Sequence, residues 1–163
     1  MKISTKGEYG IRSMIYLAMH SGARRIPIQM HEISEHQGIP KPYLKQILAG
    51  LKREGLVHSV RGPTGGHTLA RPAAEISIAQ ILLALEGSLT GIDDILTMPC
   101  HIDIGPEHCA IKELWLRAKQ AVEDVLNSTS LEDLCRRQQA ILSQNILIPT
   151  PALGPHASPT VPR

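Results

Sequence analysis

The feature that most constrains the fold is a twelve-residue segment, V-R-G-P-T-G-G-H-T-L-A-R, at positions 60–71. Short β-prone segments, 57–60 and 67–69, flank a loop with one arginine, one proline and three glycines. This pattern predicts a β-hairpin whose tip can take positive φ at Gly65 and Gly66 and from which Arg61 projects. The hairpin follows an amphipathic helix pair, and that combination is the layout of a winged helix-turn-helix.

The helix pair is predicted from apolar spacing and from a glycine between the two helices. Residues 30–37 form a short helix that Gly38 ends, and a second helix starts near Pro40 and continues to residue 54. The second helix has a core stripe at positions 44, 47, 48 and 51 and carries Lys41, Lys45 and Gln46 on its opposite face. A helix, a tight turn and a basic amphipathic helix together predict a helix-turn-helix.

Further helices are predicted on both sides of this unit. A helix over residues 7–21 starts at a Ser4 or Thr5 cap, and an extended stretch over 26–29 pairs with the hairpin. After the hairpin, helices are predicted over 76–86, 110–126 and 131–144, with irregular chain over 88–109. Five prolines from position 149 onward predict a disordered tail. The fold class is therefore mainly α with a small β-hairpin.

Charge is divided unevenly along the chain. Residues 1–71 contain 11 Lys and Arg against 4 Asp and Glu, whereas residues 72–163 contain 6 against 11. A basic N-terminal half suits a polyanion such as DNA, because neutralised phosphates release counterions. A solvated charged face without a polyanionic partner is the alternative explanation.

Hydropathy and cysteine usage indicate a cytoplasmic protein. No run approaches the ~18 apolar residues of a membrane span, and the N-terminus lacks the apolar region of a signal peptide. Three cysteines in that compartment favour free, redox-active or metal-bound thiols over structural disulfides. Cys135, beside Leu134 in the last predicted helix, is expected to be a small buried hydrophobic residue.

Several segments resemble the Rrf-two family of bacterial transcription regulators. They are the opening M-K-I-S-T-K-G-E-Y-G-I-R, the segment G-I-P-K-P-Y-L-K-Q-I-L-A-G-L-K-R-E-G-L-V-H-S-V-R-G-P-T-G-G-H-T-L-A-R-P, a cysteine-containing loop, and W-L-R-A followed by S-T-S-L-E-D-L. The resemblance covers about residues 1–144. The family includes the iron–sulfur cluster assembly repressor, the nitric-oxide-sensing repressor and the cysteine metabolism repressor.

The resemblance implies a homodimer in which the long helix over residues 110–126 forms the interface. The expected organisation is a winged helix-turn-helix DNA-binding domain over 1–72, a connecting helix and linker over 73–97, a cysteine-containing sensor loop over 98–109, a dimerisation helix and C-terminal helix over 110–144, and the Pro-rich tail over 145–163. A two-fold dimer predicts that the double-stranded DNA target is a near-palindromic operator.

The expected DNA contacts lie on the second helix of the pair and on the hairpin. The helix would enter the major groove, and Arg61 would enter the minor groove, where A·T-rich tracts concentrate negative potential. The candidate residues are Lys41, Pro42, Tyr43, Lys45, Gln46, Arg61, Gly62 and Gly65. Tyr43 is equally compatible with a packing role, and Arg61 with a solvated loop charge. Many relatives have Glu at the position of Lys45, so their base preference does not transfer.

The candidate sensor is the loop that contains Cys100 and Cys109. Cluster-binding relatives carry three cysteines there, so a 2Fe–2S cluster needs further ligands in this chain. Some relatives use two Cys, a Glu and a His from both subunits, and by that resemblance Glu8 and His36 would complete the set. His31, His101 and His108 are competing ligands. Glu8 is also expected from helix-dipole preference alone, and His36 could be a polar helix end.

Other sensor chemistries and function classes stay open. Cys100, His101, His108 and Cys109 could hold zinc, although adjacent ligands crowd a tetrahedral ion. A cofactor-free switch could instead form a disulfide between Cys100 and Cys109, and small-ligand sensing or a protein-interaction role of the winged helix are further alternatives. The sequence contains no nucleophile–base–orienter set, phosphate-binding glycine loop or metalloprotease motif, so it does not indicate an enzyme.

Overall fold

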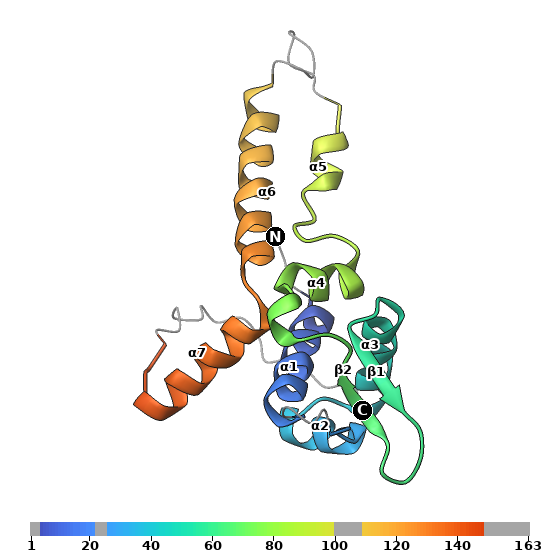
Figure 1. Ribbon diagram of the computed structural model, residues 1–163. Coiled ribbons are helices and arrows are strands. Elements are labelled where there is room, and N and C mark those ends of the chain that lie inside the picture. The colour runs from blue at the N-terminus through green and yellow to red at the C-terminus, as the bar shows by residue number, and fades with distance from the viewer. Residues whose placement is uncertain (1–3, 22–25, 100–108, 149–163) are drawn as a thin grey trace.

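The computed structural model describes residues 4–21, 26–99 and 109–148. Figure 1 shows a body made of helices and a two-stranded hairpin, with α5 (Asp93–Thr97) and the long helix α6 (Ala110–Ser128) projecting from it as a stalk. The last helix, α7 (Leu131–Gln144), returns from the base of the stalk to the side of the body near α1. This arrangement is the predicted, mainly helical winged helix-turn-helix with one long additional helix.

The body is built on α1 (Thr5–His20) and α4 (Ile78–Glu86), which cross closely. Gly7 and Gly10 make this approach feasible, because a Cβ on Gly7 would overlap Glu86 and a Cβ on Gly10 would overlap Leu85. Ser4 caps α1 by accepting a hydrogen bond from the Gly7 N–H. The core beneath this crossing is aliphatic and includes Met14, Leu17, Leu44, Ile47, Leu51, Ile76, Ile81 and Leu131, all fully buried.

The helix-turn-helix consists of α2 (Met30–Gln37) and α3 (Lys41–Arg53). Gly38 ends α2 in the left-handed region, at φ 62°, and Pro40 stands at the N-cap of α3. Between them Ile39 enters the core, and the buried Ser34 Oγ donates to its carbonyl at 2.7 Å. The predicted bounds of α2 are confirmed, and α3 ends one residue before the predicted Glu54.

The wing pairs β1 (Val57–Val60) with β2 (Gly66–Leu69) in antiparallel register, with Val57 opposite Leu69 and Val60 opposite Gly66. The predicted pairing of the stretch before α2 with the wing is confirmed, since Ile28 forms a bridge with His67.

The prediction of positive φ at Gly65 and Gly66 is wrong, because Gly62, at φ 117°, is the wing-loop glycine in that region. Gly65 and Gly66 are required for another reason. A Cβ on Gly65 would overlap the Val60 carbonyl oxygen, and one on Gly66 would overlap the Ile28 carbonyl oxygen.

After the wing, a short 3₁₀ turn, η1 (Ala73–Glu75), leads to α4, which begins at Ile78 rather than at the predicted residue 76. Ser77 and Gln80 form a capping box that fixes this start. Residues 88–109 were expected to be irregular, but the structure contains a short helix there, α5 (Asp93–Thr97). Adjacent acidic residues, Asp93 and Asp94, in the first turn favour this helix.

The long helix α6 (Ala110–Ser128) runs two residues beyond its predicted end, and α7 has its predicted bounds, with Ser130 as its N-cap. Ile78 donates to the Thr129 carbonyl at 3.0 Å and Leu131 donates to the Ile76 carbonyl at 2.8 Å. These bonds fasten the α6–α7 junction to the start of α4. The predicted tail beyond residue 148 lies outside the described residues. Among the helices that the structure describes, none is long and apolar enough to cross a membrane.

Candidate nucleic-acid interface and sensor segment

The outer face of α3 presents the predicted DNA-binding side chains to solvent. Lys41, Pro42, Lys45 and Gln46 are all exposed, while the opposite stripe lies in the core. The first turn of α3 contains no acidic residue to offset the positive end of the helix dipole, and the exposed Lys41 adds a positive charge there. Such a helix end is suited to an anion such as a phosphate.

Tyr43 occupies an intermediate position on α3. Its ring packs against the core and meets the Tyr9 ring edge-on, with centroids 5.8 Å apart and planes at 79°. The half-buried side chain therefore serves packing between α1 and α3 in the protein alone. Its partial exposure leaves a role in DNA contact compatible with the geometry.

The wing and the start of α2 border a groove of about 450 Å³, and Lys41 at the start of α3 also lines it. Lys41 from α3 and Gly62 and Gly65 from the wing line it, so the structure brings these three predicted residues together. Arg61 is exposed at the wing tip, beside the groove. The Gln29 Nε2 donates to the Pro63 carbonyl at 3.3 Å and fastens the wing tip to the start of α2.

The groove also contains two histidines that the sequence prediction did not connect with DNA. His31 lies at the start of α2 and is exposed, and His67 lies on β2 with its Nδ1 3.2 Å from the Ser59 Oγ. Burial, and then the nearby positive charge of Lys52, lower the pKa of His67. His67 is therefore predominantly neutral near pH 7, and the groove's permanent positive charge comes from Lys41.

The cysteine loop is described only at its end. Cys100, His101 and His108 lie outside the described residues, whereas Cys109 is buried, at 8% exposure, and occupies the N-cap of α6. At that position a thiolate would face the positive end of the α6 dipole. Cys135 lies in the core at 9% exposure, as predicted, and burial followed by the charge of Glu132 raises the pKa of its thiol.

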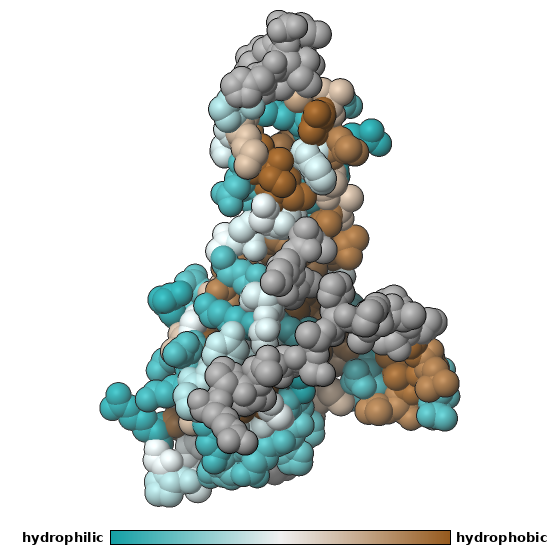
Figure 2. All heavy atoms as spheres, turned by 180° about the vertical axis from the view of Figure 1, so that it is seen from behind, coloured by the Kyte–Doolittle hydropathy of each residue, from teal (hydrophilic) through white to brown (hydrophobic). Residues whose placement is uncertain are grey.

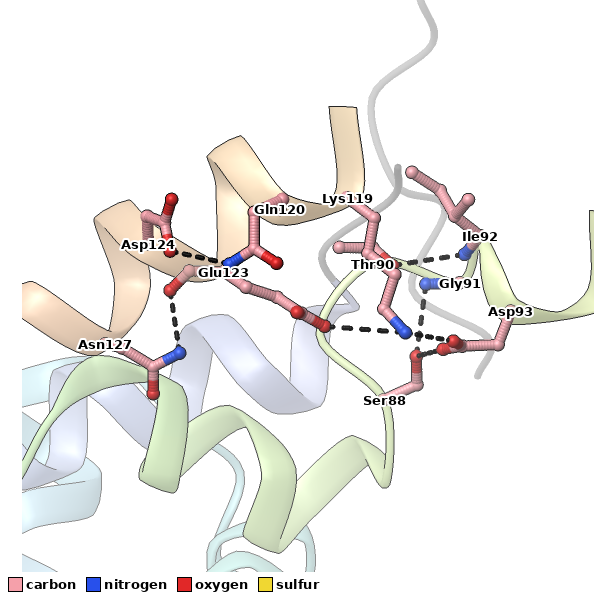
Figure 3. Close-up of polar contacts among 10 residues, drawn as sticks. All are labelled: Ser88, Thr90, Gly91, Ile92, Asp93, Lys119, Gln120, Glu123, Asp124 and Asn127. Atoms are coloured by element: carbon pink, nitrogen blue, oxygen red, sulfur yellow. Dashed lines mark hydrogen bonds and ion pairs between the residues drawn. The ribbon is translucent and has the colours of Figure 1, made fainter. Parts of the chain in front are cut away.

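A polar network fixes the base of the stalk (Figure 3). Lys119 of α6 places its Nζ 2.5 Å from Oδ1 of Asp93 and 3.7 Å from Oε1 of Glu123. The Ser88 Oγ donates to the other Asp93 oxygen at 3.0 Å and accepts from the Gly91 N–H at 3.2 Å. The hydrogen bond from Lys119, and then that from Ser88, lower the pKa of Asp93. The start of α5 is thereby tied to the middle of α6.

The predicted additional ligands, Glu8 and His36, lie beside different turns of α1. Glu8 is exposed in the first turn of α1. His36, at the end of α2, stacks on Tyr16 with ring centroids 5.4 Å apart. Tyr16 follows Glu8 by eight residues, which is about 12 Å along a helix axis. Among the described residues of one protomer, no group of three His, Cys, Asp or Glu side chains is gathered to hold a metal ion.

One face of α6 is apolar and uncovered in the single chain. Ile111, Leu114 and Val125 are 56–63% exposed on it, and the helix buries none of its 19 residues. Figure 2 shows hydrophobic side chains along the stalk and at the far end of α7. A strip of this length on a helix is normally covered by another apolar surface.

Comparisons with known proteins agree with this architecture. A family model described as "Iron-dependent Transcriptional regulator", named Rrf2, matches residues 3–137. The chain is 34% identical over 141 residues to the HTH-type transcriptional regulator IscR of Photorhabdus laumondii, covering 86% of this chain and 83% of that protein.

Two solved structures are also similar to the chain. CymR, described as the global cysteine regulator of B. subtilis, superposes with a TM-score of 0.70 at 36% identity, covering 84% of this chain and 98% of CymR. IscR of T. potens superposes with a TM-score of 0.68 at 37% identity, covering 88% and 91%. These matched proteins are regulators of transcription and not enzymes. The chain therefore belongs to the Rrf2 (Rrf-two) family of winged-helix transcriptional regulators.

Proposed function

We propose that this regulator binds a near-palindromic operator as a homodimer, with α3 in the major groove and the wing in the adjacent minor groove. The observation that carries the proposal is the groove beside the wing, which is bordered by the wing glycines, by the start of α2 and by Lys41 at the start of α3. With α3 in the major groove and the wing in the adjacent minor groove, the DNA strand between these two grooves would pass between Lys41 and the wing. The wing glycines have no side chains, so the DNA strand can approach the protein backbone closely there.

The proposed contacts divide into positioning and reading. Lys41 and the start of α3 bind phosphates. These contacts fix the position of the protein on the duplex but do not distinguish one base sequence from another. Gln46 and Lys45 are exposed one turn further and reach base edges, Gln46 toward adenine and Lys45 toward guanine or phosphate. Arg61 enters the minor groove from the wing tip and favours a narrow A·T-rich tract.

The experiment selects bound duplexes from a randomised library and measures affinity for the enriched sequence by fluorescence anisotropy. We expect an inverted repeat and a loss of at least about tenfold in affinity for Arg61→Ala. Arg137→Ala, at an exposed position of α7, is the matched control and should bind like the wild type. Equal affinity of Arg61→Ala and the wild type would overturn the wing assignment.

The proposed dimer covers the apolar face of α6. Two copies of that face would remove Ile111, Leu114 and Val125 from water at about 25 cal/mol per Å² of apolar area. The same contact would place the two recognition helices under one two-fold axis, which is what a palindromic operator requires.

We further propose that the thiols of Cys100 and Cys109 report redox or iron–sulfur status. A 2Fe–2S cluster would supply a one-electron redox change at this loop. The proposed donors are Cys100, Cys109, Glu8 and His36, drawn from two copies of the chain, and Glu8 is exposed in the first turn of α1. His36 joins this set only by leaving its stack on Tyr16.

The test is the iron and sulfide content and the visible absorption of protein purified without oxygen. We expect a brown protein whose iron is lost in Cys109→Ser, in Glu8→Ala and in His36→Gln. A colourless protein without iron, with full operator binding, would overturn the cluster while leaving the DNA-binding function intact.

A second candidate is a cofactor-free thiol switch, in which Cys100 and Cys109 form a disulfide. The similarity to CymR, a protein described as a cysteine regulator, favours it. It predicts a colourless protein whose operator affinity changes on oxidation and returns on reduction. Zinc bound by the same loop is distinguished by elemental analysis, since it would be present at about one ion per chain without colour.

A further inference from the structure

A cavity of about 460 Å³ lies between α1, α2 and α7, away from the wing groove. Its residues come from three elements that are far apart in sequence: Arg12 and Tyr16 from α1, His36 from α2 and Gln138 from α7. Its volume falls within the range of pockets that bind small molecules. The DNA-binding surface does not use it.

Aromatic rings form one wall of the cavity. His20 stacks on Tyr16 with centroids 4.0 Å apart and planes at 19°, and His36 stacks on Tyr16 at 5.4 Å and 24°. The edges of these rings are engaged, because the Tyr16 hydroxyl donates to Glu32 at 3.1 Å and the His20 Nδ1 lies 2.9 Å from the Tyr16 carbonyl oxygen. Tyr16 is buried beneath this stack, whereas His20 and His36 are exposed, so the histidine rings are the part of the wall that a planar aromatic ligand can contact.

Arg12 supplies the charge at the cavity. Its Nη2 donates to the Gln37 carbonyl oxygen at the end of α2, which fixes the guanidinium in place. A guanidinium has five N–H donors, so one such bond does not exhaust it. Of the described residues that line the cavity, none is Asp or Glu. The guanidinium of Arg12 is therefore already positioned to bind a carboxylate through two N–H groups.

We propose that this cavity binds a small aromatic carboxylate, with the ring against the stacked wall and the carboxylate on Arg12. Gln138 would add an amide donor from α7. Because α2 belongs to the helix-turn-helix and α7 follows directly on α6, the ligand would touch both the DNA-reading unit and the chain that leads to the stalk.

The test is isothermal titration of the full chain, without DNA, with three compounds of similar size. Benzoate has both the ring and the charge, cyclohexanecarboxylate has the charge without a planar ring, and benzamide has the ring without the charge. We expect saturable binding of benzoate at millimolar concentration or tighter, and at least about fivefold weaker binding of the other two.

Two variants locate the binding. Arg12→Gln should lose at least about tenfold in benzoate affinity, and the exposed Arg137→Gln should lose none. If Arg12→Gln unfolds at a lower urea concentration than the wild type, Gln138→Trp provides the second test, because an indole at this half-buried position on α7 fills the cavity and should abolish binding. Absence of saturable benzoate binding, equal binding of all three compounds, or binding unchanged by Gln138→Trp would overturn the proposal.

Discussion

Ile28 and His67 exchange two backbone hydrogen bonds, of 2.9 and 2.8 Å, which join the segment before α2 to the second strand of the wing. The wing is thereby held to the helix-turn-helix at its base as well as through the chain that follows α3. Gly66, immediately before His67, packs directly on the Ile28 backbone.

Gly66→Ala tests that contact. A Cβ there would overlap the Ile28 carbonyl oxygen and press on its carbonyl carbon, and backbone atoms cannot turn away as a side chain can. We expect a loss of about 1–3 kcal/mol in the free energy of unfolding, measured with urea, together with weakened operator binding. Thr64→Ala, at an exposed position of the wing loop, should change neither quantity. A fully stable Gly66→Ala protein would contradict the close approach.

The Asp93–Lys119 pair predicts a specific dependence of stability on pH. The pKa of Asp93 is lowered by the Lys119 and Ser88 hydrogen bonds, so its ionised form stabilises the fold above the ordinary Asp value. That contribution is lost as pH falls through the lowered pKa. We therefore expect Lys119→Met to reduce the urea midpoint at about pH 7 and to reduce it less at about pH 3.5.

Lys112→Met, on the same helix, controls for removal of a cation from α6. The pKa of Lys119 is raised by the Asp93 hydrogen bond, so the stabilisation seen at neutral pH should also fade as pH rises through that raised value. If Lys119→Met lowered the urea midpoint equally at acidic and neutral pH, the Asp93–Lys119 pair would not be the source of this stabilisation.

Cys135 is expected to be inert. It is 9% exposed, and burial raises the pKa of its thiol, so both access and ionisation oppose reaction. In the Cys100→Ser/Cys109→Ser double variant, an aromatic disulfide reagent should react with the folded protein at least about tenfold more slowly than with the protein in urea. Similar rates in the two conditions would show that Cys135 is accessible and takes part in thiol chemistry.

The α6 face predicts the oligomeric state. Val125→Lys places a charge on the exposed apolar strip, and a dimer that buries this strip should dissociate, as measured by sedimentation. Gln120→Lys adds the same charge on the opposite side of α6, next to Asp124, and should remain dimeric. A dimeric Val125→Lys protein would place the interface elsewhere.

Local sequence signals predicted much of the fold. Gly38 and Pro40 bracket a turn whose geometry has few alternatives, so α2 and the start of α3 could be placed closely. Ser130 and the apolar spacing after it located α7. The short helix α5 was not predicted, because five residues are too few to show helical periodicity.

The wing glycines show where local reasoning fails. Gly65 and Gly66 were assigned positive φ because glycine permits it, but their role is to allow contact with backbone segments, one of which lies about forty residues earlier in sequence. Only the tertiary structure contains that information. The same holds for the α1–α2–α7 cavity, where Arg12 and Gln138 meet across more than a hundred residues.

The candidate sites differ in how well sequence identified them. Lys45, Gln46 and Arg61 are exposed where helical and hairpin periodicity placed them. Glu8 and His36 were paired by resemblance to relatives, and the structure separates them by two turns of α1 because His36 packs on Tyr16. A ligand set that spans two chains cannot be read from the periodicity of one.

The central claim is that α3 and the wing bind duplex DNA through phosphates as well as bases. The most direct measurement is the affinity of the protein for its selected operator as the salt concentration is raised from about 50 to about 200 mM. The account predicts a loss of at least about tenfold, steeper than in Lys41→Gln, because each phosphate contact adds to the salt dependence. An affinity that stays constant over this range, or that is the same for random duplexes, would contradict it.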